Sequence, residues 1–134
     1  EAAGSKNVLH MHGSLARAMC AACQARWDAP LVMPVTDTCP ACGVQATRPD
    51  IVWFGEIPYG MEDIDAALQK ATVFASIGTS GNVYPAAGFV AEARRLGVRT
   101  VELNLDPSAG SSLFEDARIG PASETVPKWV AEFR

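Results

Sequence analysis

The sequence lacks long apolar runs, clustered basic residues and internal repeats. No apolar stretch approaches the ~18 residues that a membrane span requires, and no basic segment followed by an apolar run marks a secretion signal. The arginines are scattered, and the formal net charge is −4 with a pI near 5.1, which argues against a protein that works on nucleic acid. We therefore expect no membrane partner, no specific nucleic-acid partner and a cytoplasmic location.

A strand–helix–strand pattern occupies the second half of this 134-residue chain, whose 49% hydrophobic and 19% charged residues are ordinary for a globular domain. The apolar run 72–78 predicts a buried strand, and 99–106 predicts a second strand. Between them, Pro85 stands at a first helical position and Gly97 follows the expected helix end. Short connections in this order predict a right-handed βαβ unit with a parallel sheet, and therefore an α/β fold.

Shorter elements are expected in the rest of the chain, from alternating apolar residues, helical spacing and turn residues. They are a strand over 7–12 that ends at Gly13, a β-rich run over 50–56, a helix over 61–71, a short helical turn before a brief strand around 118–120, and a terminal helix interrupted or started near Pro127.

Four cysteines follow the spacing C-x2-C-x15-C-x2-C. They are Cys20, Cys23, Cys39 and Cys42. In a chain without a secretion signal, this spacing indicates one structural Zn²⁺ held by four thiolates, with no open position for water. Two disulfides, a redox C-x2-C pair, or a site in which His10 or His12 replaces a cysteine are the alternatives. We expect residues 18–43 to form a small inserted zinc-binding module.

The two histidines are free for chemistry if the cysteines hold the metal. His10 and His12 are two residues apart and share one face of an extended segment. A histidine before a glycine at a strand end is more often structural or exposed than catalytic. The pattern alone does not choose between the two side chains.

Six segments together resemble the sirtuins, the NAD-dependent protein deacylases, and are most similar to bacterial members of the class III branch. The segments are HMHGSLARAMCAAC, CPACG, RPDIVWFGE, IGTSGNVYPAAGF, VELNLD and IGPASETVP, in the order and spacing of the family. The resemblance implies a Rossmann-like parallel sheet with helices, formed by residues 1–17 and 44–134, around the zinc module. It also implies NAD as a cosubstrate and acyl-lysine proteins or peptides as substrates.

The resemblance also implies roles for individual residues. His12 is similar to the family's catalytic base, whereas His10 matches no catalytic position. A second set is similar to residues that contact the dinucleotide: Gly78, Thr79, Ser80, Asn104, Leu105, Asp106 and Ala122. The family often has Glu where Asp106 stands, and GTSG lacks the G-x-G-x-x-G order. A third set is similar to the strand that pairs with the substrate peptide: Val52, Phe54, Gly55 and Glu56.

Two family segments have no counterpart in the printed sequence, a glycine-rich G-A-G-x-S loop and a Q-N-x-D segment before the His-Gly pair. We therefore interpret the chain as the C-terminal part of a sirtuin, with an incomplete NAD-binding part. The full-length protein is expected to be a deacylase of the deacetylase or desuccinylase type. The isolated chain is expected to be poorly stable and inactive, because strand 72–78 would expose an apolar edge. A zinc-ribbon module that binds nucleotide or peptide without chemistry, and an ADP-ribosyl transferase, are the alternative functions.

Overall fold

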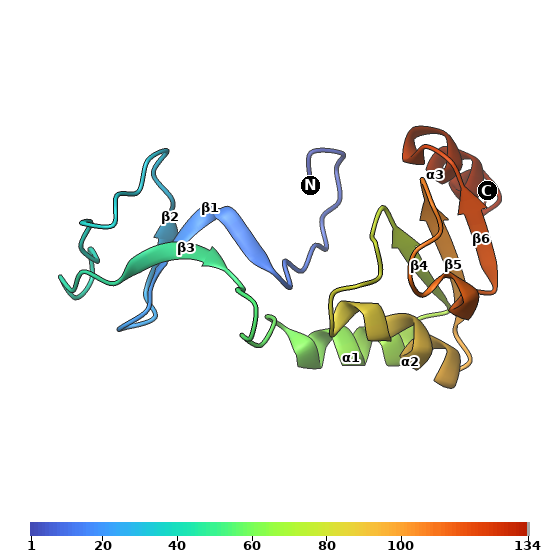
Figure 1. The fold of residues 1–134 in the computed structure, drawn as a ribbon, viewed down its shortest axis with the longest axis horizontal. Coiled ribbons are helices and arrows are strands. Elements are labelled where there is room, and N and C mark those ends of the chain that lie inside the picture. Colours follow the sequence, from blue (N-terminus) through green and yellow to red (C-terminus); the bar gives the residue numbers. More distant parts are fainter. Residues whose placement is uncertain (134) are drawn as a thin grey trace. The chain divides into compact units, whose positions relative to one another are not determined.

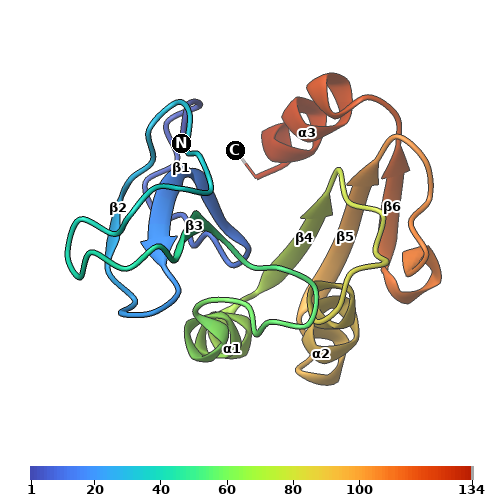
Figure 2. The same ribbon diagram turned by 60° about the vertical axis from the view of Figure 1, so that its left-hand side comes forward.

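The structure of this chain is a computed structural model that describes residues 1–133 (Figures 1 and 2). These residues divide into two compact units, Glu1–Met61 and a second unit from Glu62 on. Within the part of the chain described, no helix combines the length and apolar character that crossing a membrane requires.

The first unit contains a three-stranded antiparallel sheet of order β2-β1-β3, with β1 at Gly13–Cys20, β2 at Arg26–Asp28 and β3 at Thr47–Ile51. Pro49 lies within β3, opposite Ala18 of β1. Proline has no N–H to donate, and β3 tolerates it because this strand lies at an edge of the sheet. The sheet buries the end of β1, residues 18–20.

Two expected strands of this unit were wrong in their bounds. Residues 7–10 belong to no strand, and Met11 and His12 form a turn, in which the Met11 and Gly13 N–H groups donate to the carbonyl oxygens of Leu9 and His10. The strand begins only at Gly13. The run 50–56 is extended only to Ile51. Beyond it the Glu56 N–H donates to the Trp53 carbonyl oxygen at 3.0 Å, which closes a turn.

The second unit contains a three-stranded sheet of order β4-β5-β6, in which both pairs of neighbours are parallel. Its strands are β4 at Val73–Ile77, β5 at Arg99–Asn104 and β6 at Asp116–Ile119. Its helices are α1 at Met61–Lys70, α2 at Phe89–Arg95 and α3 at Ala122–Ala131, with short 3₁₀ turns at Ala86–Gly88 and Ser111–Leu113. The parallel β4–α2–β5 arrangement confirms the βαβ unit and the α/β fold class.

The core of the second unit lies between α1, α2 and the sheet. Leu68 of α1, Ala93 of α2 and Val98 are buried against one another, and the side chain of Phe74 on β4 packs against them. In both views α1 and α2 lie side by side. The central strand β5 is buried from residue 100 to residue 103, because neighbours cover both of its edges and helices contact it.

Two details of the second unit differ from the sequence expectation. The strand 72–78 is present as β4, but it is half-buried and Ile77 is 45% exposed, because β4 is one of the two edge strands of this sheet. The terminal helix neither starts at Pro127 nor is interrupted there, since α3 begins at Ala122 and continues through Pro127. The separation of residues 18–43 as a distinct zinc module stays a prediction.

Candidate functional site

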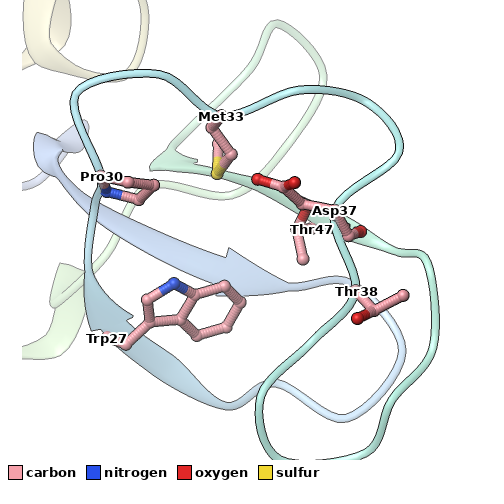
Figure 3. Close-up of a pocket in the computed structure, with 6 residues that line it drawn as sticks. All are labelled: Trp27, Pro30, Met33, Asp37, Thr38 and Thr47. Atoms are coloured by element: carbon pink, nitrogen blue, oxygen red, sulfur yellow. Dashed lines mark hydrogen bonds between the residues drawn. The ribbon is translucent and has the colours of Figure 1, made fainter.

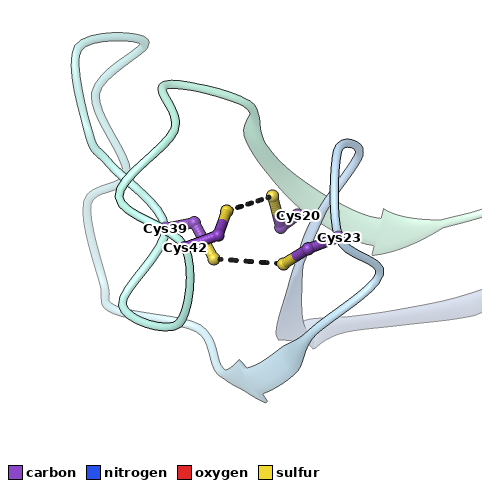
Figure 4. Close-up of side chains that lie close together, drawn as sticks. All are labelled: Cys20, Cys23, Cys39 and Cys42. Carbon is purple, nitrogen blue, oxygen red and sulfur yellow. Dashed lines mark hydrogen bonds between the residues drawn. The ribbon is translucent and has the colours of Figure 1, made fainter.

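The four cysteines converge on one point (Figure 4). Their sulfur atoms all lie within 4.8 Å of one another. The Sγ atoms of Cys20 and Cys42 are 3.8 Å apart, and those of Cys23 and Cys39 are 3.7 Å apart. A disulfide would require about 2.05 Å, and all four cysteines are free thiols in the structure. Four sulfurs at about 2.3 Å from one Zn²⁺ in a tetrahedron would be about 3.8 Å apart, which fits the observed set.

Both C-x2-C turns have the same backbone hydrogen bonds. The Cys20 N–H donates to the Ala25 carbonyl oxygen and the Gln24 N–H donates back to Cys20, both at 2.9 Å. At the second turn the Cys39 N–H donates to Val44 at 2.9 Å, and the Gly43 N–H donates back to Cys39 at 2.8 Å. The fourth residue after the first cysteine has a positive φ in each turn, 62° at Gln24 and 72° at Gly43. The sequence therefore builds two equivalent turns, each of which aims two sulfurs at the same position.

Local hydrogen bonds shift the pKa values of the Cys39 and Cys42 thiols in opposite directions. Burial acts to raise the pKa of the Cys39 thiol, but backbone N–H groups of Cys42 and Ala41 lower this pKa to about 7. The Val44 N–H acts to lower the pKa of Cys42, whereas the Cys23 thiol and burial raise it to about 12. A bound Zn²⁺ would supply the positive charge that four adjacent thiolates require, and the donor set is positioned to bind one zinc ion.

His12 lies in the turn that leads into β1. The Gly13 N–H donates to the His10 carbonyl oxygen at 2.9 Å, and the His12 carbonyl oxygen accepts the Val52 N–H at 3.0 Å. Gly13 has a φ of +79°, and a Cβ at this position would lie 2.1 Å from the Asp50 carbonyl oxygen. Only glycine fits this crossing, and it fixes the backbone of His12 beside the start of the 52–56 segment.

The two histidine side chains have different surroundings. The His10 Nε2 atom lies 3.1 Å from the Glu1 carboxylate. Both rings are exposed, and within residues 1–133 no hydrogen bond to the His12 ring is found. The His12 imidazole is therefore open to a group from outside, whereas His10 has a partner.

The 52–56 segment is held by Glu56 and Arg48. Arg48 donates two hydrogen bonds to the Glu56 carboxylate, at 2.5 and 2.8 Å, and the Trp53 N–H donates a third at 2.9 Å. These donors lower the pKa of Glu56 to about 2, with Arg48 as the main cause. The guanidinium carbon of Arg48 also lies 4.5 Å from the centre of the Trp53 ring. The Glu56 carboxylate is thus bound by Arg48 and by the Trp53 N–H, whereas the Phe54 side chain is 98% exposed.

A buried carboxylate behind this segment was not identified from the sequence. Asp50 on β3 is 7% exposed and accepts hydrogen bonds from the Arg26 Nε at 3.0 Å and from the Tyr59 hydroxyl at 2.8 Å. Arg26 also lies over the Tyr59 ring, at 5.4 Å from its centre. Asp50 could have been identified as an acidic residue within a predicted strand, because a carboxylate that is buried requires hydrogen-bond partners.

In the second unit, the predicted cofactor residues gather at the carboxyl edge of the parallel sheet. Asn104 ends β5, and its side-chain amide donates to the Thr79 carbonyl oxygen at 2.7 Å. The backbone carbonyl oxygen of Asn104 accepts a hydrogen bond from the Gly120 N–H at 2.9 Å. Gly78, with a φ of +66°, directly follows β4, and its N–H donates to Leu103 at 3.1 Å. Asn104 therefore ties together the loops that follow all three strands.

The remaining members of that set extend the same edge. The carbonyl oxygen of Ser80 accepts the Ala109 N–H at 3.0 Å, which links the loop after β4 to the loop after β5. Leu105 and Asp106 follow Asn104 and are exposed. Ala122 is the first residue of α3, directly after the loop that leaves β6. The structure thus brings these seven residues to one edge, where open α/β sheets bind ligands.

Glu102 is a second buried carboxylate that was not identified from the sequence. It is 0% exposed on β5 and accepts the Ser108 N–H at 2.9 Å and the Ser111 hydroxyl at 2.5 Å. Burial acts to raise the pKa of Glu102, but the hydrogen bonds from Ser108 and Ser111 lower it. Glu102 therefore stays charged and holds the loop that carries Asp106.

Several known proteins are similar to this chain in sequence and in fold. The model of the Sir2 family matches residues 1–85. A relative from Caulobacter vibrioides, named NAD-dependent protein deacylase, is 51% identical over 131 residues, which cover 97% of this chain and 55% of the relative. The solved structure of a Sir2 homologue–NAD complex aligns with a TM-score of 0.87 at 30% identity, over 97% of this chain and 52% of that one. That of Sir2Af2 bound to a myristoylated histone peptide aligns with a TM-score of 0.78 at 28% identity, over 97% and 58%. The chain spans about half the length of these relatives.

Proposed function

The chain belongs to the Sir2 family, and from this premise we propose that the protein acts as an NAD-dependent protein-lysine deacylase. The reaction transfers the acyl group of an acyl-lysine to ADP-ribose and releases nicotinamide. The observation that carries the proposal is the position of His12, whose open imidazole is fixed by the backbone beside the 52–56 segment. The C. vibrioides relative with the deacylase name is 51% identical over nearly the whole chain, which supports the same activity.

His12 is proposed as the general base. Imidazole is the side chain that most often accepts a proton near neutral pH, and the His12 ring is exposed to an incoming group. Its task would be to take a proton from a ribose hydroxyl, so that the hydroxyl oxygen can attack the carbon derived from the acyl group. Gly13 supports this task, because it lets the chain cross β3 closely and holds the His12 backbone in place.

The cosubstrate NAD is proposed to bind at the carboxyl edge of the β4-β5-β6 sheet. The loop after β4 offers backbone groups and the small side chains of Thr79 and Ser80. The exposed carboxylate of Asp106 is suited to accept hydrogen bonds from ribose hydroxyls. Ala122 at the start of α3 and the Asn104–Leu105 backbone complete the proposed contacts. The similarity to a Sir2 homologue–NAD complex supports this assignment.

Acyl-lysine peptides are the proposed substrates, and they are proposed to bind along the 52–56 segment. Because Arg48 occupies the Glu56 carboxylate, Glu56 would act by holding the turn, while Val52, Gly55 and Phe54 would offer backbone groups and an exposed ring. Backbone pairing of this kind tolerates many peptide sequences. The similar structure of Sir2Af2 with a myristoylated histone peptide supports a peptide substrate. Within this proposal we assign the protein to the deacetylase or desuccinylase type and to the cytoplasm.

The proposal is tested with the full-length, zinc-loaded protein, NAD and matched peptides that carry acetyl-lysine or succinyl-lysine. Nicotinamide release that depends on the acylated peptide is expected with at least one of the two. His12→Ala should abolish turnover, because it removes the proposed base. His10→Ala should retain turnover, because His10 matches no catalytic position and, within residues 1–133, its ring is paired with Glu1. Zinc content should be unchanged in both variants. Full turnover in His12→Ala would refute the base assignment, and transfer of ADP-ribose to the peptide would favour an ADP-ribosyl transferase.

A further inference from the structure

The first unit has a hollow beside β2 with a cavity volume of about 210 Å³. Six residues line it: Trp27, Pro30, Met33, Asp37, Thr38 and Thr47. Figure 3 shows the Trp27 indole on one side of the hollow, with the Met33 and Asp37 side chains across from it. The wall thus combines an aromatic ring, a carboxylate and hydroxyl oxygens.

The loop that carries Asp37 is fixed by hydrogen bonds. The Asp37 N–H donates to the Pro34 carbonyl oxygen at 3.0 Å, and the Thr47 hydroxyl donates to the Asp37 carbonyl oxygen at 3.3 Å. The Gln45 side chain donates to the Val35 carbonyl oxygen at 2.8 Å. The backbone of Asp37 is therefore held in place, and its side chain lines the hollow.

Asp37 differs from the other acidic residues between residues 13 and 61. Asp28 pairs with Arg17, Asp50 with Arg26, and Glu56 with Arg48. Within residues 1–133, no lysine or arginine lies within ion-pair distance of the Asp37 carboxylate. Asp37 is thus a carboxylate with hydroxyl neighbours and no positive charge beside it.

At two other positions in the first unit, an arginine contacts both a carboxylate and an aromatic ring. Arg26 bonds to Asp50 at 3.0 Å and lies 5.4 Å from the centre of the Tyr59 ring. Arg48 bonds to Glu56 at 2.5 Å and lies 4.5 Å from the centre of the Trp53 ring. Trp27 and Asp37 form a third pair of aromatic ring and carboxylate across the hollow, and no cation of residues 1–133 lies over the Trp27 ring.

We propose that this hollow binds a basic side chain, lysine or arginine, of a protein or peptide partner. The indole face attracts a cation, the Asp37 carboxylate accepts its N–H groups, and Met33 and Pro30 contact its methylene stem. The unpaired Asp37 carboxylate would repel an anion. A volume of about 210 Å³ is also below the 300–1,000 Å³ typical of pockets for whole small molecules, which suits one side chain rather than a nucleotide.

The proposal is tested with n-butylammonium chloride, the side-chain analogue of lysine, added to the full-length, zinc-loaded protein. The readout is the NMR signal of the Trp27 indole N–H, identified by its loss in Trp27→Phe. We expect a saturable shift with a midpoint on the order of 10 mM, as suits a probe of five heavy atoms. Sodium chloride at the same ionic strength and n-butanol at the same concentration are expected to give no saturable shift.

Two charge variants complete the test. Asp37→Asn should raise the midpoint roughly three- to tenfold, because it removes the ion pair and leaves the ring. Asp28→Asn removes the same charge from an exposed carboxylate that is already paired with Arg17, and it should leave the midpoint unchanged. Zinc content is measured in each variant to confirm that the cysteine turns are intact. An equal shift with n-butanol, no shift with n-butylammonium, or equal effects of the two variants would each overturn the proposal.

Discussion

The buried carboxylate of Glu102 accepts the backbone N–H of Ser108 at 2.9 Å, six residues further along the chain. The Ser111 hydroxyl donates a second hydrogen bond to the same carboxylate at 2.5 Å. A strand in the centre of the sheet thereby holds two points of the loop that begins at residue 105. That loop carries Asp106, the acid proposed to contact the ribose of NAD.

Ser111→Ala and Glu102→Gln should loosen this loop. Each removes a charge-assisted hydrogen bond at a buried carboxylate position, and Ser111→Ala should cost about 1–3 kcal/mol of unfolding free energy. If the proposed function holds, both variants should raise the KM for NAD several-fold while the KM for the acyl-lysine peptide stays within about twofold. Ser112→Ala, at the exposed neighbouring position, is the control. Equal changes in both KM values would indicate a general loss of folding instead.

Gly13→Ala should destabilise the first unit more than any other glycine-to-alanine change with a similar φ. The new Cβ would lie 2.1 Å from the Asp50 carbonyl oxygen, in addition to the strain of a φ of +79°. We expect a loss of about 3 kcal/mol or more, measured by denaturant unfolding. Gly55→Ala is the matched control, because Gly55 has a φ of +91° with no atom within 4 Å, and strain alone should cost about 1–2 kcal/mol. Similar losses in both variants would show that the crossing at Gly13 is not tight.

Gln24→Gly should stabilise the zinc-binding turns. Gln24 holds a positive φ of 62°, which glycine adopts without the Cβ strain of other residues. The equivalent position of the second turn already has Gly43. We expect a gain of about 1 kcal/mol in thermal or denaturant unfolding, reduced by the loss of the exposed Gln24 side-chain hydrogen bond to Ala21. Gly43→Gln is the reciprocal change and should be destabilising, whereas a gain there would contradict the equivalence of the two turns.

Cys39→Ser should release the metal. The four sulfurs form one set within 4.8 Å, so that loss of one ligand breaks the tetrahedron. Metal analysis should give one zinc per chain in the unmodified protein and much less in the variant. Amide hydrogen exchange should accelerate over residues 18–43, because few buried side chains hold this segment apart from the cysteines. Full zinc occupancy in Cys39→Ser would refute the four-cysteine site.

The Glu56–Arg48 pair should give a stability contribution that is lost in acid. The folded-state pKa of Glu56, about 2, lies below its ordinary value of 4.5. The contribution is therefore complete above about pH 4.5 and disappears as the pH falls toward 2. The unfolding free energies of the unmodified protein and of Glu56→Gln should differ at pH 6, and the difference should shrink as the pH falls from 4.5. A difference that is constant over this range would show that the carboxylate charge is not responsible.

Local patterns predicted several elements because short-range physics determines them. The helix over 61–71 was confirmed as α1, with Ile64 and Leu68 on the side that packs into the core. The βαβ unit was also confirmed by the parallel pairing of β4 and β5. Gly97, with a φ of +75°, follows the end of α2, as the pattern predicted. The cysteine spacing correctly placed four sulfurs together, since each C-x2-C turn is closed by its own backbone.

Other features could not be predicted, because partners far away in the sequence determine them. The extended run ends at residue 51 and a turn from Trp53 to Glu56 follows. Arg48 binds the Glu56 carboxylate, and no periodicity encodes that pair. The buried carboxylates Asp50 and Glu102 have the appearance of ordinary polar residues until Tyr59 and Ser111 are brought to them. The catalytic role of His12 and the cofactor role of the 78–80 and 104–106 segments were implied by family resemblance and stay predictions.

The sequence by itself determined which four cysteines lie together, the parallel pairing of the strands in one βαβ unit and the family of the chain, because cysteine spacing, apolar periodicity and motif order can all be read along the chain. Only the tertiary structure decided which of the two histidines has a side-chain partner, which carboxylates are buried and why Gly13 must be glycine. These outcomes depend on close approaches between segments that are distant along the chain, where one hydrogen-bond partner or one Cβ decides between a stable and an unstable arrangement.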